Sequence, residues 1–371
     1  MGVHVLSFAA ALVTFGILIV VHEFGHFVFA KLTGISVARF SVGFGPVLWK
    51  REFRNTRYQL AAIPFGGFVH LVGQSRTREG NEHELKMLRK KLSPAAYAAC
   101  TREEERFANR PGWAQFLTAI GGPIFSVIFG LVLMTGINVM VGEPYTNDPL
   151  VLEIVLENSP AASAGLQPGD VVTQIDGQSY PLWFDFSQKI ARKLGRSVEI
   201  AGSRDGEPFS YTITPERDPE SSRYVIGVQF APQTIENRNL SVSAGATKAL
   251  RSVQGVFVGT YMFVARAVTG KAKIKEVRGP VGILDVGTEI FSTGILAGIS
   301  FASFLSVVLG VTQLIPIPPL DGSRVLLALW KIVFGTEAPE FVVAPVMIVG
   351  VAFLLTLAVM VTYHDLMRLF S

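Results

Sequence analysis

This sequence has little cysteine and little charge. Its 371 residues include one cysteine, Cys100, which excludes an internal disulfide and a cysteine-rich metal site. Only 17% of the residues are charged, 49% are hydrophobic, and the mean hydropathy is +0.41. Since soluble domains carry about 25% charged residues on average, this balance argues against an ordinary soluble enzyme and predicts a membrane protein.

The chain also lacks a basic stripe with interleaved aromatic residues, although its net charge is +4 and its pI is near 9.1. The lysines and arginines are scattered along the sequence. We interpret them as charge that flanks membrane segments, and we predict no nucleic-acid partner.

Four long apolar runs are present, at residues 5–30, 114–141, 295–315 and 341–362. Each is long enough to cross a lipid bilayer as a helix, which takes about 20 apolar residues. The first run lacks the charged n-region of a signal peptide, so we interpret residues 1–31 as a transmembrane helix. The pattern predicts a multi-pass α-helical membrane protein with three further transmembrane segments, at residues 114–141, 295–331 and 341–366.

The distribution of lysine and arginine sets the expected orientation. None precedes the first span, whereas several follow it closely: Lys31, Arg39, Lys50, Arg51, Arg54 and Arg57. The positive-inside bias therefore places residues 31–113 in the cytoplasm. With four spans, both termini and the stretch between the second and third spans would lie outside.

The stretches between the spans differ in character. Residues 34–73 contain FSVGFGP and RYQLAAIPFGGFVHLV, whose aromatics and paired glycines predict a small membrane-associated β-layer. Residues 74–113 are charged and helix-prone, and we predict a cytoplasmic linker there. Residues 241–294 are predicted to form an amphipathic linker at the membrane surface.

Residues 149–230 alternate strand-like runs with one helical segment and predict an inserted α/β domain. The stretch SPAASAGLQPGDVVTQIDGQSY resembles the PDZ domains of membrane-associated bacterial proteases. That resemblance implies that peptide termini bind by adding a strand to an exposed sheet edge. The alternative is a spacer domain that has no ligand.

The sequence HEFGH occurs inside the first apolar run, at residues 22–26. His22 and His26 are four residues apart, so they share one helix face and can bind one zinc ion, while Glu23 can act on a water molecule. An ionisable side chain at the centre of a membrane helix costs about 2.5–3.5 kcal/mol, which metal coordination can offset. The alternative is that these side chains hydrogen-bond to neighbouring helices or reach the membrane interface.

A third metal ligand must come from elsewhere in the chain. The third span is interrupted by Pro316, Pro318 and Pro319, after which LDGSRVLLALW resumes a helix. Membrane proteins tolerate such a break where the backbone lines a polar cavity. Asp321 follows the break and is our candidate ligand, although an Asp-Gly-Ser sequence also suits a helix N-cap.

Taken together, HEFGH, FSVGFGP, IPFGGFV, one PDZ-like segment and QLIPIPPLDG resemble the bacterial site-2 proteases, in particular the regulator-of-sigma-E type. The resemblance covers almost the whole chain and implies a zinc-dependent intramembrane endopeptidase in the bacterial inner membrane. His22, His26 and Asp321 would then bind Zn²⁺, and Glu23 would be the catalytic base. The HEFGH motif would lie near the cytoplasmic side, with the PDZ domain in the periplasm.

The same resemblance implies a substrate class and a way of holding it. Substrates would be single-pass membrane proteins, such as anti-sigma factors, that have already been cut once outside the membrane. Residues of the β-layer would hold the substrate extended near the metal, because a helical peptide bond is shielded by its own hydrogen bonds. The candidates are Gly43, Phe44, Gly45, Gly66 and Gly67.

Two positions depart from the family pattern. Gln313 stands where the third span of the family usually has asparagine, and Ser126 stands where the second span has asparagine. The amide of Gln313 could face the cleft and stabilise the transition state, or it could pair with a neighbouring helix.

Two other functions compete with a protease. A catalytically silent membrane adaptor that uses its PDZ domain would have lost a ligand or the base, yet all four positions are filled. A zinc transporter should repeat polar residues across several spans or show internal symmetry, and neither appears in the sequence.

Overall fold

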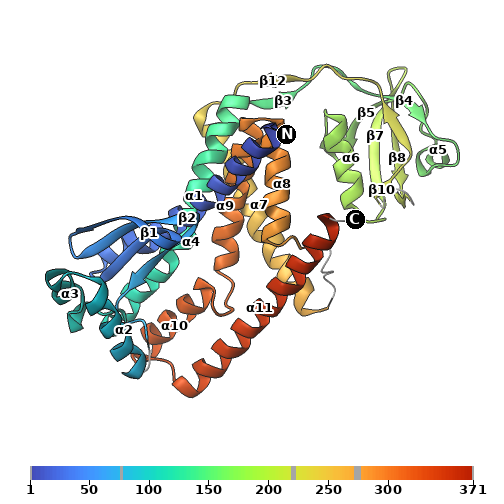
Figure 1. The fold of residues 1–371 in the computed structure, drawn as a ribbon. Coiled ribbons are helices and arrows are strands. Elements are labelled where there is room, and N and C mark those ends of the chain that lie inside the picture. The colour runs from blue at the N-terminus through green and yellow to red at the C-terminus, as the bar shows by residue number, and fades with distance from the viewer. Residues whose placement is uncertain (1, 76–77, 219–222, 271–276, 370–371) are drawn as a thin grey trace. The chain divides into compact units, whose positions relative to one another are not determined.

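The computed structural model describes residues 2–75, 78–218, 223–270 and 277–369 (Figure 1). The chain forms two compact units. We call Met1–Val139 together with Ser241–Ser371 the membrane unit, and Met140–Leu240 the inserted unit.

Four helices of the described residues are long and apolar enough to cross a membrane: α1 (Gly2–Leu32), α4 (Gly112–Val141), α9 (Ile295–Gln313) and α11 (Glu340–Leu369). They correspond to the four predicted spans, which confirms the predicted class. A helix is favoured there because its backbone groups hydrogen-bond within the segment and need no water.

Glycines let these helices approach closely. A Cβ atom added to Gly25 of α1 would stand 2.2 Å from the Gly121 carbonyl oxygen of α4. Gly310 of α9 also lies close to α4, because its Cβ would meet the Pro123 carbonyl oxygen at 2.7 Å. Small residues commonly allow such contact between membrane helices, and here they bring α1 and α9 against the same helix.

The β-layer consists of two long bent strands, β1 (Val37–Phe53) and β2 (Thr56–Leu71). Residues 39–42 of β1 lie between two segments of β2, 57–60 on one side and 67–70 on the other. Gly43, Gly45 and Gly66 have positive φ angles, which glycine adopts without steric cost, and they lie where the strands bend. The short runs expected from the sequence are therefore parts of two continuous strands, packed against α1.

Residues 78–109 are more than the solvated linker that we expected. They form α2 (Arg78–Lys91), α3 (Pro94–Cys100) and two short 3-10 helices, η1 (Glu103–Glu105) and η2 (Phe107–Asn109). Helices α2 and α3 share a small core with the β-layer, made by Ala38, Val72, Leu88, Leu92, Ala96 and Cys100. Burial in this core raises the pKa of the Cys100 thiol to about 11, so the thiol is protonated and unreactive at neutral pH.

The segment predicted as an amphipathic linker contains two helices, α7 (Val242–Val268) and α8 (Pro280–Thr293). Val253 of α7 packs against Val307 and Val311 of α9. Helix α8 packs against α1 and α11, and the buried carboxylate of Asp365 on α11 accepts the Gly282 N–H at 2.8 Å. Both helices thus support the bundle. The last helix of the membrane unit is α10 (Asp321–Phe334).

The inserted unit is a small α/β domain. Its main sheet has the strand order β11-β4-β5-β7-β8, with β6 paired to β5. The elements are β4 (Leu150–Val155), α5 (Pro160–Ala164), β5 (Val171–Ile175), β6 (Gln178–Ser179), α6 (Trp183–Arg192), β7 (Val198–Arg204), β8 (Glu207–Ile213), β9 (Glu216–Arg217), β10 (Tyr224–Val225) and β11 (Val228–Phe230).

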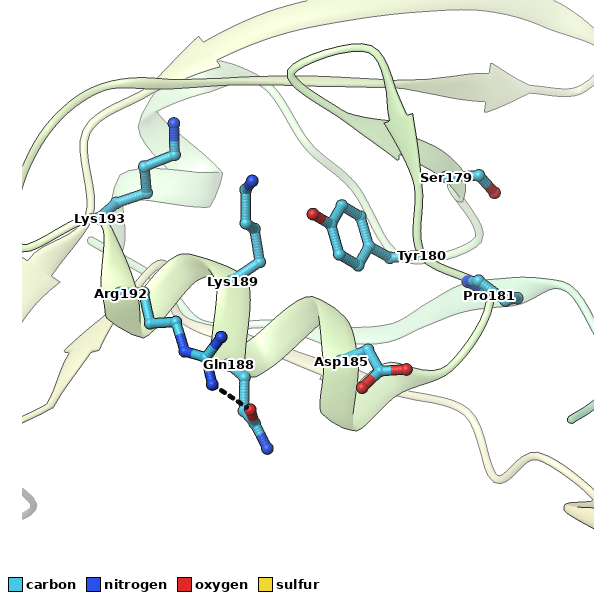
Figure 2. Close-up of a pocket in the computed structure, with 8 residues that line it drawn as sticks. All are labelled: Ser179, Tyr180, Pro181, Asp185, Gln188, Lys189, Arg192 and Lys193. Atoms are coloured by element: carbon cyan, nitrogen blue, oxygen red, sulfur yellow. Dashed lines mark hydrogen bonds between the residues drawn. The ribbon is translucent and has the colours of Figure 1, made fainter. Parts of the chain in front are cut away.

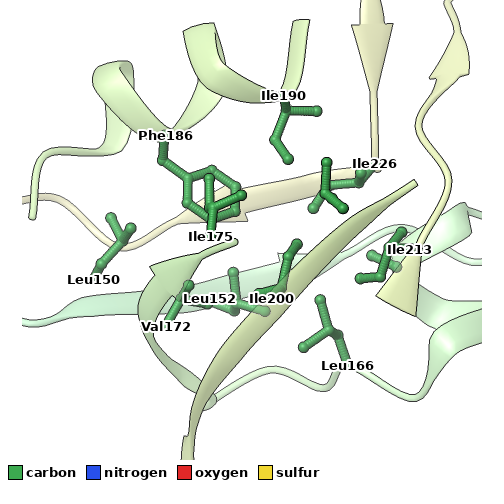
Figure 3. Close-up of a cluster of buried hydrophobic side chains, with 12 residues drawn as sticks. Leu150, Leu152, Leu166, Val172, Ile175, Phe186, Ile190, Ile200, Ile213 and Ile226 are labelled. Atoms are coloured by element: carbon green, nitrogen blue, oxygen red, sulfur yellow. The ribbon is translucent and has the colours of Figure 1, made fainter. Parts of the chain in front are cut away.

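The apolar residues of this domain gather in one core between α6 and the sheet (Figure 3). Phe186 and Ile190, four residues apart on α6, meet Ile175 and Ile200 there. Among the described residues, strand β11 pairs with β4 alone, so its other side is a sheet edge to which no described strand is paired.

The two ends of the inserted unit form a short ribbon. Strand β3 (Glu143–Tyr145) pairs antiparallel with β12 (Glu236–Arg238). The Tyr145 hydroxyl donates to Glu236 at 2.7 Å, and the Arg238 guanidinium lies over the Tyr145 ring. We refer to β3 and β12 as the neck.

Candidate metal centre

Helix α1 presents His22 and His26 on one face. Both are buried, with their ring centroids 4.9 Å apart and their Nε2 atoms 3.3 Å apart. The four-residue spacing produces this arrangement, because residues i and i+4 lie one turn apart on a helix.

Asp321 reaches the two histidines from almost 300 residues further along the chain. Its Oδ2 atom lies 2.9 Å from His22 Nε2 and 3.0 Å from His26 Nε2. The proline-rich break ends α9 at Gln313 and lets α10 begin at Asp321. The N-cap of α10 is Leu320, with no side-chain capping bond, so the Asp321 carboxylate is not the cap that the sequence also allowed.

The three side chains fit a metal ion. Their ligand atoms lie within 4.8 Å of one another, and no other group of three such side chains occurs among the described residues. Gly122 of α4 keeps the space beside them open, because a Cβ at this position would stand 2.3 Å from His26 Nε2 and 2.7 Å from His22 Nε2. Two imidazoles and one carboxylate form a ligand set that zinc uses in hydrolytic enzymes, with one position left for water.

The far nitrogens of both imidazoles also have partners. His26 Nδ1 donates to the Thr118 carbonyl oxygen at 2.8 Å, and His22 Nδ1 lies 3.0 Å from the Ser126 hydroxyl. With the proton on Nδ1, each ring presents the lone pair of Nε2 to the metal position. Ser126, one of the two departures from the family pattern, therefore contacts a candidate ligand directly.

Glu23 joins the metal centre to the β-layer. Its Oε2 atom accepts the backbone N–H of Val69 in β2 at 3.0 Å. This contact places the carboxylate beside the outer edge of the 67–71 segment, whose inner edge pairs with β1.

A hydrogen-bonded chain of side chains that the motifs did not indicate lies next to Val69. Arg39 donates to His70 Nδ1 at 3.0 Å, and His70 Nε2 donates to Glu84 at 2.7 Å. Glu84 also accepts the Gly73 N–H at 3.1 Å. We call Arg39, His70 and Glu84 the β2 anchor, because they tie the end of this strand to β1 and α2.

The five β-layer residues predicted to hold substrate lie around the bends of β1 and β2. The Phe44 ring, about half exposed, stacks on Phe68 at 6.2 Å and covers Gly66. Gly67 lies against the Ser41 carbonyl oxygen, and Gly43 lies against that of Ile63. Gly45 has a positive φ of 86°. Gly66 thus immediately precedes the 67–71 segment that contacts Glu23, and Gly67 begins it.

Gln313 is the last residue of α9 and is half-buried. Its amide makes no hydrogen bond to another described residue. The inserted unit has a separate hollow of about 520 Å³, between α6 and the segment after β6 (Figure 2). Lys189, Arg192 and Lys193 line it, and Lys193 is paired with Asp176. It contains no candidate metal ligand set among the described residues.

The fold and this site define a membrane-embedded, metal-dependent hydrolase with a carboxylate beside its metal ligands. The chain belongs to peptidase family M50, whose family model matches residues 10–357. It is an intramembrane zinc metalloprotease of the site-2 type, as the sequence motifs predicted.

The similarity to two bacterial proteins extends over nearly the full length of both chains in each comparison. A protein of Clostridium acetobutylicum, named as a candidate zinc metalloprotease, is 31% identical over 96% of both chains. The regulator of sigma-W protease RasP of Bacillus subtilis is 27% identical over 97% of this chain and 98% of its own. Among solved structures, the PDZ domain of an SdrC-like protein from Listeria monocytogenes is 25% identical and covers 23% of this chain and 90% of its own, with a TM-score of 0.22.

Proposed function

We propose that His22, His26 and Asp321 hold the zinc ion and that Glu23 is the catalytic base. The observation that carries this proposal is the convergence of two Nε2 atoms and one Oδ2 atom within hydrogen-bond distance, from α1 and α10. Buried polar groups are costly inside an apolar bundle, and a shared metal ion accounts for why these three face one another.

Bound zinc supplies a Lewis acid that polarises the scissile carbonyl and lowers the pKa of water. Glu23 adjoins the ligand His22 in the sequence, and its carboxylate can take the proton of the attacking water and return it to the leaving amine. The Val69 N–H fixes the direction of that carboxylate before the reaction begins.

The substrate is an extended segment that adds to the outer edge of residues 67–71. A strand edge offers a row of N–H and C=O groups, and pairing with them unwinds a helical substrate next to Glu23. Gly66 and Gly67 let β2 pack closely against Phe44 and Ser41 where this edge begins, and the bends at Gly43 and Gly45 lie in the facing strand β1. We expect these glycines and Phe44 to hold the extended substrate in position. The half-buried amide of Gln313 is a candidate donor to the oxyanion.

The physiological substrates are single-pass membrane proteins, with anti-sigma factors as the leading candidates. This follows from similarity to a relative that is named a regulator of sigma-W protease. The chain acts in the bacterial inner membrane with its metal centre near the cytoplasmic side. The inserted unit lies outside and binds peptide termini along the open edge of β11.

Zinc content and cleavage, measured on the same preparations, test the proposal. Glu23→Gln should keep about one zinc per chain and lose cleavage of a model single-pass substrate, because glutamine cannot accept the proton of water. His22→Ala and Asp321→Ala should lose both. Undiminished cleavage by Glu23→Gln, or full zinc in either ligand variant, would refute these assignments.

A further inference from the structure

The membrane unit contains a cavity of about 720 Å³ that adjoins the metal centre. Its size is within the range of about 300–1,000 Å³ that ligand sites occupy. Helix α10, which begins with the candidate ligand Asp321, supplies Ser323 and Arg324 to its wall. One wall of the cavity is thus built on the same helix turn as the metal ligand.

Arg324 connects the cavity with the metal centre. Its Nη1 atom lies 3.8 Å from Asp321 Oδ1, whereas Oδ2 of the same carboxylate faces the two histidines. That distance is too long for a hydrogen bond, and the guanidinium donates to no other described residue. About half of the Arg324 side chain is exposed, so its donors can bind an anion that enters the cavity.

The two carboxylates in the wall, Glu337 and Glu340, form no ion pair with Arg324 among the described residues. Glu337 is held by the Lys331 ammonium at 2.7 Å. Glu340 belongs to α11, which contributes no residue to the metal centre. Arg324 therefore supplies the positive charge in the cavity wall, and this charge lies next to the candidate metal ligand Asp321.

The rest of the wall suits a polypeptide. Leu327 and Met347 are among its apolar lining residues, and Gln74 and Asn81 are among its polar ones. The Asn81 Oδ1 atom is buried and has no hydrogen-bond partner among the described residues. A buried acceptor without a donor is costly, and a peptide N–H in the cavity would satisfy it.

Peptide-bond hydrolysis creates one new α-carboxylate and one new amine. The carboxylate forms at the former scissile carbonyl, next to the metal ligands. We propose that this cavity receives the carboxyl-terminated product, with Arg324 binding the new carboxylate and Asn81 accepting a backbone N–H. The inference rests on the proposed function for the position of the scissile bond.

Binding of labelled hexapeptides to full-length, zinc-loaded Glu23→Gln protein tests this. The probe is a mixture of alanine, leucine and serine hexapeptides that end in a free carboxylate, compared with the same mixture as C-terminal amides. We expect the free acids to bind at least about tenfold more tightly, the effect of one charge-assisted contact. Adding Arg324→Gln should bring the two affinities to within about twofold, and Arg324→Lys should restore part of the preference.

Three controls establish that the preference arises in this cavity. Arg251→Gln removes an exposed arginine of α7 outside the cavity and should leave the preference unchanged. Ala344→Trp adds bulk to the α11 wall of the cavity while keeping Arg324, and should weaken binding of both peptide forms. Zinc itself can bind a carboxylate, so each measurement is repeated after chelation, where an Arg324-dependent preference should persist.

Equal binding of acid and amide, or a preference that Arg324→Gln leaves intact while zinc content is normal, would overturn the inference. Because binding needs no turnover, such a result with an active wild-type enzyme removes this inference alone. Intact, Arg324-dependent binding by a wild-type protein that cleaves nothing would instead keep the carboxylate site but remove the proposed function, and with it the assignment of the bound peptide as a cleavage product.

Discussion

Gly122 shows how much one missing side chain matters at the metal centre. Its Cα faces the two Nε2 atoms, and a Cβ would overlap both. We expect Gly122→Ala to lower zinc affinity by at least about tenfold, the size of effect that changes around metal ligands produce. Zinc titration of the purified protein, followed by cleavage assays at saturating zinc, measures this.

The matched control is Gly136→Ala in the same helix. A Cβ at position 136 meets nothing within 4 Å, and alanine favours a helix more than glycine does. This variant should keep wild-type zinc affinity and activity. If both alanine variants bind zinc normally, the space beside Gly122 is not where the metal lies.

Sequence alone could select His22, Glu23, His26 and Asp321 as candidates, because the spacing of HExxH fits one face of a helix and Asp321 follows a proline break. It could not identify Gly122, Thr118 or Val69. These act through a missing side chain, a carbonyl oxygen and an N–H group, which every residue type can supply. Ser126 was noted only as a departure, and its contact with His22 appears once α1 and α4 are packed.

At the scale of the elements, strand β2 contains both the proposed substrate-binding edge and Val69, whose N–H group contacts the candidate base Glu23. The β2 anchor holds its end through His70, which bonds Arg39 and Glu84 at the same time. His70→Ala should lower kcat for a peptide substrate by about tenfold with little change in KM or zinc content, because the Val69 N–H no longer fixes Glu23. Steady-state kinetics and metal analysis on one preparation test this.

A rescue variant and a control make the positioning role specific. His70→Gln keeps one donor and one acceptor, so it should recover part of kcat. His83, an exposed neighbour on α2, provides the control, since His83→Ala should change nothing. An unchanged kcat in His70→Ala would show that the anchor does not position Glu23.

The length of the apolar runs predicted the four membrane helices. The strand-like runs that alternate with one helical segment predicted the inserted α/β domain. The helices α7 and α8 and the core around Cys100 were described as linkers instead. In the sequence, the apolar residues of these segments alternate with polar ones. Leu88 and Leu92, on either side of the end of α2, form a buried face only when the β-layer is folded beside them. Helix α7 packs on α9, and α8 packs on α1 and α11.

At the scale of the whole molecule, the inserted unit is expected to exclude substrates that still carry bulky external domains. Replacing residues 147–234 by a short turn should then increase cleavage of untrimmed substrates and leave that of trimmed ones unchanged. The paired strands β3 and β12 allow this deletion, because their ends already lie side by side. Cleavage of both substrate forms in vesicles is the measurement.

The control is a variant in which an unrelated domain of similar size is joined to β3 and β12, to test whether size alone causes the exclusion. It should restore exclusion if size alone matters. Lower cleavage of untrimmed substrates in the deletion variant, with the zinc content intact, would show instead that the inserted unit recruits them.

The neck also has a mechanical meaning. A force that pulls on the inserted unit is transmitted along the two covalent backbones of β3 and β12, which run side by side. The hydrogen bonds between these strands therefore do not carry that force. Twisting, by contrast, strains these hydrogen bonds directly. One backbone continues from α4, which carries Thr118, Gly122 and Ser126, and the other continues into α7, which packs on α9. Tension on the inserted unit would therefore divide between α4, which contacts both candidate histidine ligands, and α7, which packs on α9.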